Sequence, residues 1–246
     1  MTLVEILSPS CALFLDFDGT MVDIAPQPQA VHVPQPLLAT LREVQAYLHG
    51  AVAVISGRPI TQIDAFLEPL QLPVAGVHGA ERRGADGRMH LLNTHPLDHV
   101  EEAARGLAAQ HERLLVESKR GSLALHYRQA PELEELCLRT MADAVSESPG
   151  VTLLRGKMVV EAKPGGASKG RAIEDFLAEP PFAGRAPVFI GDDVTDEVGF
   201  STVQRIGGLG IKVGEGATVA WRRLADPAAL HRELRAAMAA RSTRTA

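Results

Sequence analysis

An apolar stretch near the start of the chain ends in two aspartates that stand one residue apart. The segment 13–20 reads LFLDFDGT. An unpaired carboxylate is costly to bury, so acids at the end of an apolar strand need a partner. Alternate side chains of a strand share a face, so Asp16 and Asp18 point the same way, and Gly19 allows a sharp exit. The pattern predicts a buried strand over residues 11–17 with a chemical site at its carboxyl end, where open α/β sheets bind their ligands.

Strand and helix signals alternate along most of the chain, which is typical of a parallel sheet covered by helices. Short apolar runs predict further strands at 51–55, 74–77, 188–190 and 209–213, the last of these closing the sheet. Apolar residues at helical spacing predict helices over 36–48, after Pro59, from Lys169 and at the carboxyl end. We therefore predict an α/β fold with a doubly wound, Rossmann-like parallel sheet as its core.

The middle of the chain follows a different order, which is helix, hairpin, helix, hairpin. Helical patterns cover residues 97–111 and 131–146, and each is followed by a pair of short strands. We predict a smaller α/β cap domain over residues 94–163, inserted between the two parts of the core domain, 1–93 and 164–246. The segments 93–95 and 162–166 are the predicted hinges between them.

Charge and cysteine content exclude several classes of protein. The net charge is −5 and no basic tract is present, which argues against nucleic acid as a partner. No apolar run approaches the roughly 20 residues of a membrane span, and residues 1–10 lack the basic start of a signal peptide. Cys11 and Cys137 lie far apart and are predicted to be buried thiols of a reducing compartment. We expect a cytoplasmic monomer.

Polar residues mark the ends of other predicted elements. Ser56 follows the second strand, Lys169 begins a helix, and Asp192, Asp193 and Asp196 follow the strand at 188–190. Carboxylates from separate strand ends suit Mg²⁺, which prefers oxygen ligands and substrate phosphate. A hydroxyl, a helix N-terminus and a lysine suit a phosphate group. We interpret the combination as a site for phosphoryl transfer through an aspartyl-phosphate.

Four segments, 16–20, 56–58, 169 and 191–197, together resemble the motifs of the haloacid dehalogenase superfamily of phosphatases. The resemblance implies that Asp16 is the nucleophile and that Asp18 is the general acid and base. It also implies that Mg²⁺ is bound by the Asp16 carboxylate, the main-chain carbonyl of Asp18 and Asp192. Asp193 and Asp196 are then either ligands or residues that orient the ion's water and the lysine.

A narrower resemblance covers nearly the whole chain. The segments 76–81, 125–128, 161–170 and the form GDDVTDE at 191–197 resemble trehalose-6-phosphate phosphatases. This resemblance implies hydrolysis of trehalose 6-phosphate, with the cap closing over the sugar and with Glu117, Lys119 and Glu161 contacting its hydroxyls. His126 and Arg128 share one face of a predicted strand and are further candidates for substrate contact.

Simpler structural interpretations remain open for several of these residues. Arg58 suits either a phosphate contact or an ion pair with an acid. Ser56 suits a helix cap, and Lys169 a solvated helix start. For the cap candidates the alternatives are an exposed ion pair between Glu117 and Lys119, a solvated face at His126 and Arg128, and a surface ladder of Lys157, Glu161 and Lys163.

The function also has alternatives. One is a phosphatase for another sugar phosphate, of the sucrose or mannosylglycerate type. A second is a regulator that binds a sugar phosphate without catalysis, and the paired Asp16 and Asp18 argue against it. A third is a phosphomutase, which would have to exclude water from its site.

Overall fold

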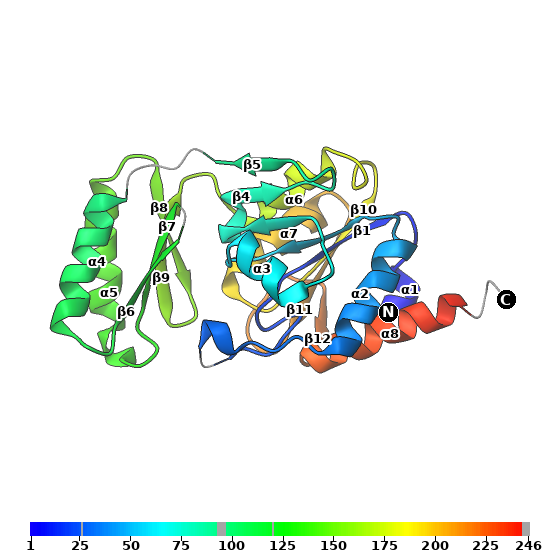
Figure 1. The fold of residues 1–246 in the computed structure, drawn as a ribbon, viewed down its shortest axis with the longest axis horizontal. Helices are drawn as coiled ribbons and strands as arrows, with labels where there is room; N and C mark the ends of the chain where they lie inside the picture. The colour runs from blue at the N-terminus through cyan, green and yellow to red at the C-terminus, as the bar shows by residue number, and fades with distance from the viewer. Residues whose placement is uncertain (26, 93–96, 120, 243–246) are drawn as a thin grey trace. The chain divides into compact units, whose positions relative to one another are not determined.

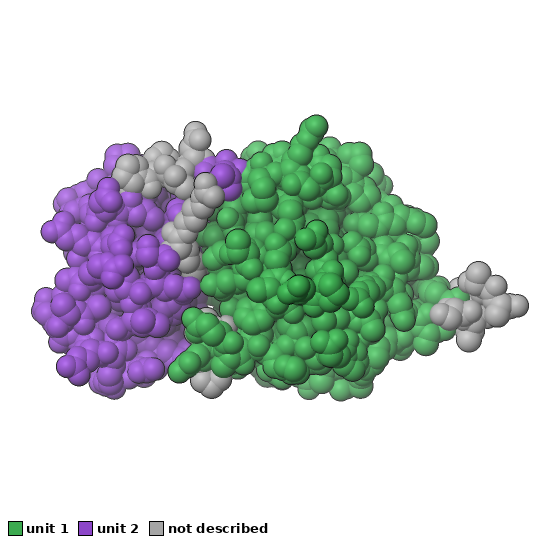
Figure 2. Space-filling model, in the orientation of Figure 1, with its two compact units in different colours: residues 1–90, 168–246 green, residues 91–167 purple. Residues whose placement is uncertain are grey.

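The computed structural model describes residues 1–25, 27–92, 97–119 and 121–242. The chain divides into two compact units (Figure 2). The core unit comprises Met1–His90 and Ser168–Ala246, and the inserted unit comprises Leu91–Ala167. The predicted cap range of 94–163 falls within the inserted unit. The predicted hinge at 93–95 lies outside the described residues, whereas residues 162–164 belong to a strand of the inserted unit.

Eight strands form the sheet of the core unit. They are β1 (Cys11–Leu15), β2 (Val52–Ile55), β3 (Val74–Gly76), β4 (Glu81–Arg83), β5 (Met89–Leu91), β10 (Ala186–Gly191), β11 (Leu209–Val213) and β12 (Arg222–Leu224). Their order is β12-β11-β10-β1-β2-β3-β4-β5, and neighbours are parallel from β12 to β3, while β3 and β4 are antiparallel (Figure 1). The central place of β1 explains its unbroken apolar sequence, because a parallel strand is covered on both faces.

Helices cover both faces of this sheet, which confirms the predicted α/β class. They are α1 (Leu3–Ile6), α2 (Gln35–Tyr47), α3 (Ile60–Leu67), α6 (Lys169–Leu177), α7 (Glu197–Arg205) and α8 (Pro227–Ser242), with short 3₁₀ turns η1 (Pro28–Ala30), η2 (Val77–Gly79) and η4 (Val194–Asp196). α6 and α7 pack together on one face, and α8 packs against α1 and α2 on the other (Figure 1). Across the described part of the chain, no helix has the length and apolar character needed to cross a bilayer.

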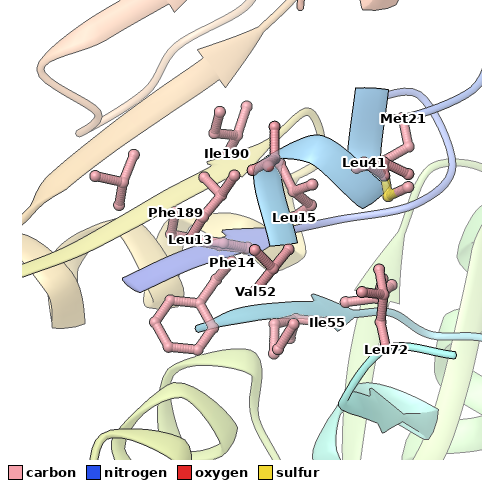
Figure 3. Close-up of a cluster of buried hydrophobic side chains, with 14 of the residues drawn as sticks. Leu13, Phe14, Leu15, Met21, Leu41, Val52, Ile55, Leu72, Phe189 and Ile190 are labelled. Atoms are coloured by element: carbon pink, nitrogen blue, oxygen red, sulfur yellow. The ribbon is translucent and has the colours of Figure 1, made fainter. Parts of the chain in front are cut away.

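Large apolar side chains fill the space between the sheet and its helices (Figure 3). Phe14 of β1 is fully buried, and its ring centroid lies 6.0 Å from that of Phe176 on α6 and 5.5 Å from that of Phe182. On the neighbouring strand β10, the ring centroid of Phe189 lies 5.3 Å from that of Phe200 on α7. This packing fixes β1, β10 and α6 relative to one another, and their ends carry most of the candidate site.

The prediction that residues 209–213 form the last strand is wrong. β12 follows β11 and pairs with it in parallel, with Ile211 opposite Arg222. Its sequence, Arg-Arg-Leu, contains a single apolar residue, so it lacks the apolar run from which a strand is predicted. Short strands with charged side chains are common at sheet edges, where they discourage pairing with another chain.

The inserted unit is a two-layer structure of its own. Its strands are β6 (Leu115–Lys119), β7 (Ser122–His126), β8 (Val151–Gly156) and β9 (Val159–Pro164), which form an antiparallel sheet in the order β6-β7-β9-β8. Its helices are α4 (Asp98–Gln110) and α5 (Glu134–Ser146), and the short turn η3 (Pro131–Leu133) precedes α5. Val100 and Cys137 of the helices pack with Leu125 and Val160 of the sheet in a separate apolar cluster. Both helices therefore cover one face of this sheet.

Candidate active site

The candidate site lies at the carboxyl edge of the core sheet. Asp16 follows β1, Ser56 follows β2 and Asp192 follows β10. Because β10, β1 and β2 are adjacent and parallel, their carboxyl ends meet at one edge. The amide of Asp16 donates to the carbonyl of Ile190 at 2.9 Å, so the parallel ladder continues to the first residue of the site.

A buried lysine joins two of the carboxylates. Lys169 Nζ donates to Asp16 Oδ1 at 2.6 Å and to Asp196 Oδ1 at 2.5 Å, and all three side chains are almost inaccessible to solvent. Lys169 is the first residue of α6, and Ser168 caps that helix by accepting the amide of Arg171 at 3.1 Å. Burial alone would lower the pKa of Lys169, but the two carboxylates outweigh it and raise that pKa above its ordinary value.

Three carboxylates lie close enough to share a cation. Oxygens of Asp16, Asp192 and Asp196 all lie within 4.8 Å of one another. Burial raises the pKa of Asp16 well above its usual range, and burial with the nearby Asp196 raises that of Asp192 to about 6. Like charges this close disfavour ionisation, and a divalent cation relieves that repulsion. An all-oxygen donor set suits Mg²⁺ or a similar hard ion.

Asp196 is already fully engaged by the protein. Its Oδ1 binds Lys169, and its Oδ2 accepts the amides of Asp192 and Asp193, each at 2.9 Å. Asp196 therefore shapes the loop that carries Asp192, while Asp16 and Asp192 have the freer oxygens. Asp193 contributes nothing to the group of three carboxylates found among the described residues.

Arg58 forms a bidentate ion pair with Asp18 through two nitrogens of its guanidinium group. Nε donates to Asp18 Oδ2 at 2.6 Å and Nη2 to Oδ1 at 2.7 Å. Nη1 donates to Gln62 at 3.2 Å, and the guanidinium lies over the rings of Phe17 and Phe66. Of the two interpretations of Arg58, the structure contains the ion pair. A phosphate contact by the same side chain stays a prediction.

The Ser56 hydroxyl lies in the turn that follows β2. Its Oγ accepts the amide of Arg58 at 3.1 Å, and the side chain is buried. A hydroxyl that accepts one hydrogen bond still has its own hydrogen to donate. Ser56 therefore caps this turn and can in addition donate to a phosphoryl oxygen.

The remaining sequence candidates lie in the inserted unit. His126 Nε2 lies 2.9 Å from Glu117 Oε2, and Ser122 Oγ donates to Glu161 Oε1 at 2.6 Å. Glu117 and Glu161 both stand opposite Ala124 of β7, so they share the face of the sheet that the helices leave uncovered. Glu161 is buried, so the solvated surface ladder proposed for it is wrong.

Arg128 and Lys119 are less informative. Arg128 is exposed, lies beyond the end of β7, and makes a long 3.5 Å contact with the carbonyl of Lys157. The backbone of Lys119 ends β6, but its side chain lies outside the described residues. Substrate contact by either side chain therefore stays a prediction.

Sequence reasoning missed two residues that contact Asp192. Thr20 Oγ1 donates to Asp192 Oδ1 at 3.2 Å, and the buried Lys212 donates to the main-chain carbonyl of Asp192. Lys212 had a visible signal, because a lysine inside the apolar run of β11 needs an acceptor. Thr20 had none beyond its place as the last residue of the motif at 16–20.

Comparison with known proteins shows which proteins the chain is similar to. The sequence model of the trehalose-phosphatase family matches residues 14–228. The chain is 45% identical over 228 residues to trehalose-6-phosphate phosphatase of Escherichia coli strain K12, covering 89% of this chain and 83% of that protein. It is 44% identical over 208 residues to a probable trehalose-phosphate phosphatase of Sinorhizobium fredii, covering 82% and 77%.

Solved structures show the same fold. The C-terminal domain of trehalose-6-phosphate phosphatase from C. albicans superposes with a TM-score of 0.86 at 21% identity, covering 94% of this chain and 93% of that one. A haloacid dehalogenase-like hydrolase from B. subtilis superposes with a TM-score of 0.67 at 14% identity, covering 91% and 99%. At these identities the likeness concerns the arrangement of the elements.

Proposed function

Because the chain belongs to the trehalose-phosphatase family, we propose that it is a Mg²⁺-dependent enzyme that hydrolyses trehalose 6-phosphate to trehalose and phosphate. The observation that carries this proposal is the buried contact of Lys169 with Asp16 and Asp196 at the carboxyl edge of the sheet. It presents one carboxylate, already oriented, beside a cation that can also attract a phosphoryl group.

In the first step, the Asp16 carboxylate attacks phosphorus and the bond from phosphorus to the sugar oxygen breaks. Lys169 keeps the carboxylate oriented, and the Ser56 hydroxyl donates to a phosphoryl oxygen. Asp18 gives its proton to the departing sugar oxygen, which leaves as the alcohol. The products of this step are trehalose and a phosphoryl group esterified to Asp16.

In the second step, Asp18 removes a proton from a water molecule that attacks the phosphorus of the aspartyl-phosphate. The bond to Asp16 breaks, phosphate leaves and the carboxylate returns. In the structure both carboxylate oxygens of Asp18 accept hydrogen bonds from Arg58, so neither is free to carry a proton to the substrate. Proton donation in the first step therefore requires Asp18 to leave the Arg58 contact.

The carboxylates fit a resident Mg²⁺ ion. Asp16 and Asp192 would hold it, with Asp196 and Lys212 fixing the backbone on either side of the Asp192 α-carbon. Mg²⁺ bound there would offset the charge of the phosphate and help to orient it.

We further propose that side chains of the inserted unit select the sugar. Glu117, held by His126, and Glu161, held by Ser122, present carboxylate oxygens on one face of the antiparallel sheet. Sites built to bind sugar hydroxyls reject substrates that lack them, because buried polar groups are then left unpaired.

The test is phosphate release with Mg²⁺ from trehalose 6-phosphate, other sugar phosphates and para-nitrophenyl phosphate. We expect trehalose 6-phosphate to give the highest kcat/KM. Glu117→Ala and Glu161→Ala should lower that value by roughly 10- to 100-fold. The kcat/KM for para-nitrophenyl phosphate should change little in both variants. Glu147→Ala, at an exposed position of the same unit, is the control. Equal loss on both substrates would contradict a role in sugar selection.

The intermediate has its own test. With an aryl phosphate, whose leaving group needs no proton, Asp18→Asn should still form the aspartyl-phosphate but hydrolyse it slowly. Intact-protein mass spectrometry should then detect a phosphoryl group on Asp18→Asn and none on Asp16→Asn. A phosphorylated or active Asp16→Asn protein would show that Asp16 is not the nucleophile.

A further inference from the structure

The turn between β3 and β4 holds two consecutive non-glycine residues in the left-handed backbone region. Val77 has a φ of 48° and His78 a φ of 54°, and both side chains are buried. L-residues avoid this region, and for a β-branched residue such as Val77 it is a clear outlier. Such strain persists only where the surroundings over-determine it, and it is concentrated at functional sites. The two outliers therefore point to a function for this turn, and its contacts with neighbouring segments indicate which one.

On one side, the turn holds the segment that carries Ser56. The amide of His78 donates to the carbonyl of Ser56 at 2.9 Å, and the amide of Val77 donates to the carbonyl of Arg58 at 3.0 Å. Between these two bonds, the His78 ring lies against Gly57, where an added Cβ would come within 2.6 Å of ring atoms. The Ser56–Gly57–Arg58 turn is thus held at both ends and covered in the middle.

On the other side, the same segment contacts the start of α6. Gly79, with a φ of 97°, lies against the main-chain carbonyl of Ser168, and an added Cβ would stand 2.9 Å from that oxygen. Further along the segment, Arg82 pairs with Glu179 beyond the end of α6, and its guanidinium lies 4.9 Å from the centroid of the Phe176 ring. The segment therefore touches the residue directly before Lys169 and the far end of the same helix.

We propose that residues 77–82, which we name the bracket, are a positioning element for the phosphate site. The left-handed turn of the bracket sets the distance between the Ser56 hydroxyl and the N-terminus of α6, where Lys169 stands. The two groups come from segments more than a hundred residues apart in the sequence, and the bracket contacts both. The inference rests on the proposed phosphatase function and concerns only the phosphoryl group, whichever sugar carries it.

The test uses substitutions at His78 that differ in their tolerance of a positive φ. Glycine and asparagine adopt the left-handed region readily, and alanine does not. We expect His78→Ala to weaken inhibition by inorganic phosphate about tenfold and to raise the KM for para-nitrophenyl phosphate about tenfold, since small displacements of positioning groups have effects of this size. His78→Gly and His78→Asn should stay within about threefold of the unsubstituted protein.

His49 provides a matched control. It has a φ of 50°, is exposed, and precedes β2 at the end opposite Ser56. His49→Ala introduces the same residue into the same backbone conformation, so it should lower the melting temperature without changing either constant. The proposal is overturned if His78→Ala keeps normal constants. It is also overturned if all three His78 variants weaken inhibition by inorganic phosphate equally, because loss of the imidazole ring rather than a change in the turn would then be responsible.

A second measurement does not depend on any variant folding. Amide hydrogen exchange of the unsubstituted protein should slow in residues 56–58, 74–82 and 168–170 together when inorganic phosphate and Mg²⁺ are added, because a ligand suppresses local opening of the unit that binds it. Unchanged exchange at 74–82 beside slowed exchange at 56–58 would overturn the proposal. Failure of the unsubstituted protein to bind or release phosphate at all would instead contradict the proposed function.

Discussion

Replacement of Asp192 by asparagine should stabilise the metal-free protein, although it damages the site. Burial and the neighbouring Asp196 raise the pKa of Asp192 to about 6, against 3.8 for an ordinary aspartate. The folded state therefore disfavours the ionised carboxylate. At about 1.4 kcal/mol for each unit of pKa, the cost at neutral pH is at most about 3 kcal/mol. Asp192→Asn keeps the shape of the side chain and its acceptor for Thr20 while removing this charge.

The sign of the pH dependence follows from the raised pKa. Between pH 3.8 and about 6 the folded state binds more protons at Asp192 than the unfolded state does, so this group's contribution to stability falls as pH rises. From pH 5 to pH 7 the contribution should fall by about 1.3 kcal/mol. Without metal, the advantage of Asp192→Asn over the unsubstituted protein should therefore be larger at pH 7 than at pH 5 by this amount.

Urea unfolding in EDTA at both pH values measures this difference. Effects of distant titrating groups cancel when each variant is compared with the unsubstituted protein at the same pH, whereas the response of Asp16, whose pKa Asp192 helps to raise, adds to the measured difference. Asp143→Asn, at an exposed position on α5, is the control and should be neutral. Millimolar MgCl₂ should stabilise the unsubstituted protein and have little effect on Asp192→Asn. An Asp192→Asn protein that is less stable than the unsubstituted one at pH 7 in EDTA would refute this account of the site.

Three further predictions test other parts of the structure. Asp16→Asn should abolish phosphate release in a coupled assay while circular dichroism remains unchanged, and residual turnover would contradict its role. Lys212→Met should raise, at least threefold, the Mg²⁺ concentration that gives half of the maximal thermal stabilisation, because the Asp192 carbonyl loses its donor. Lys212→Arg should restore part of the affinity for Mg²⁺. Phe176→Ala should lower the free energy of unfolding by about 3–5 kcal/mol in urea titration, whereas Ile206→Ala, which is exposed, should change it by less than about 0.5 kcal/mol.

The sequence was informative where burial and charge conflict. Asp16 and Asp192 could be recognised because each follows an unbroken apolar run, which predicts both the strand and the need for a partner. The parallel order of these strands then predicts that their ends meet. The α/β fold could be anticipated from these patterns, and the contact between Asp16 and Lys169 agrees with them.

Pairings that depend on tertiary geometry could not be predicted in the same way. Arg58 had two plausible partners in the sequence, and only the folded backbone brings both its nitrogens to Asp18. Glu161 accepts a hydrogen bond from Ser122 of a neighbouring strand, and the linear sequence does not pair these two residues. β12 was missed because its edge position requires no apolar alternation.

The left-handed turn of the bracket shows a more general limit. Neither Val77 nor His78 favours a positive φ, so local propensity points away from the observed conformation. The turn forms because its amides reach the carbonyls of Ser56 and Arg58 and because the apolar core holds β3 in place. Local preference and global fold disagree here, and such disagreement is expected at functional sites.

The site therefore holds two unfavourable features, which the apolar core must offset. One is a cluster of three carboxylates balanced by a single ammonium group, for a formal charge of −2, which one divalent cation would neutralise. The other is the left-handed turn of the bracket. Substitutions that relieve either feature, such as Asp192→Asn or His78→Gly, should stabilise the metal-free protein or leave its stability unchanged, but only the first should abolish metal binding. The effects of charge and of backbone strain at this site can therefore be measured separately. The carboxylate charge binds the cation, and the strained turn sets the spacing of the groups that bind the phosphate.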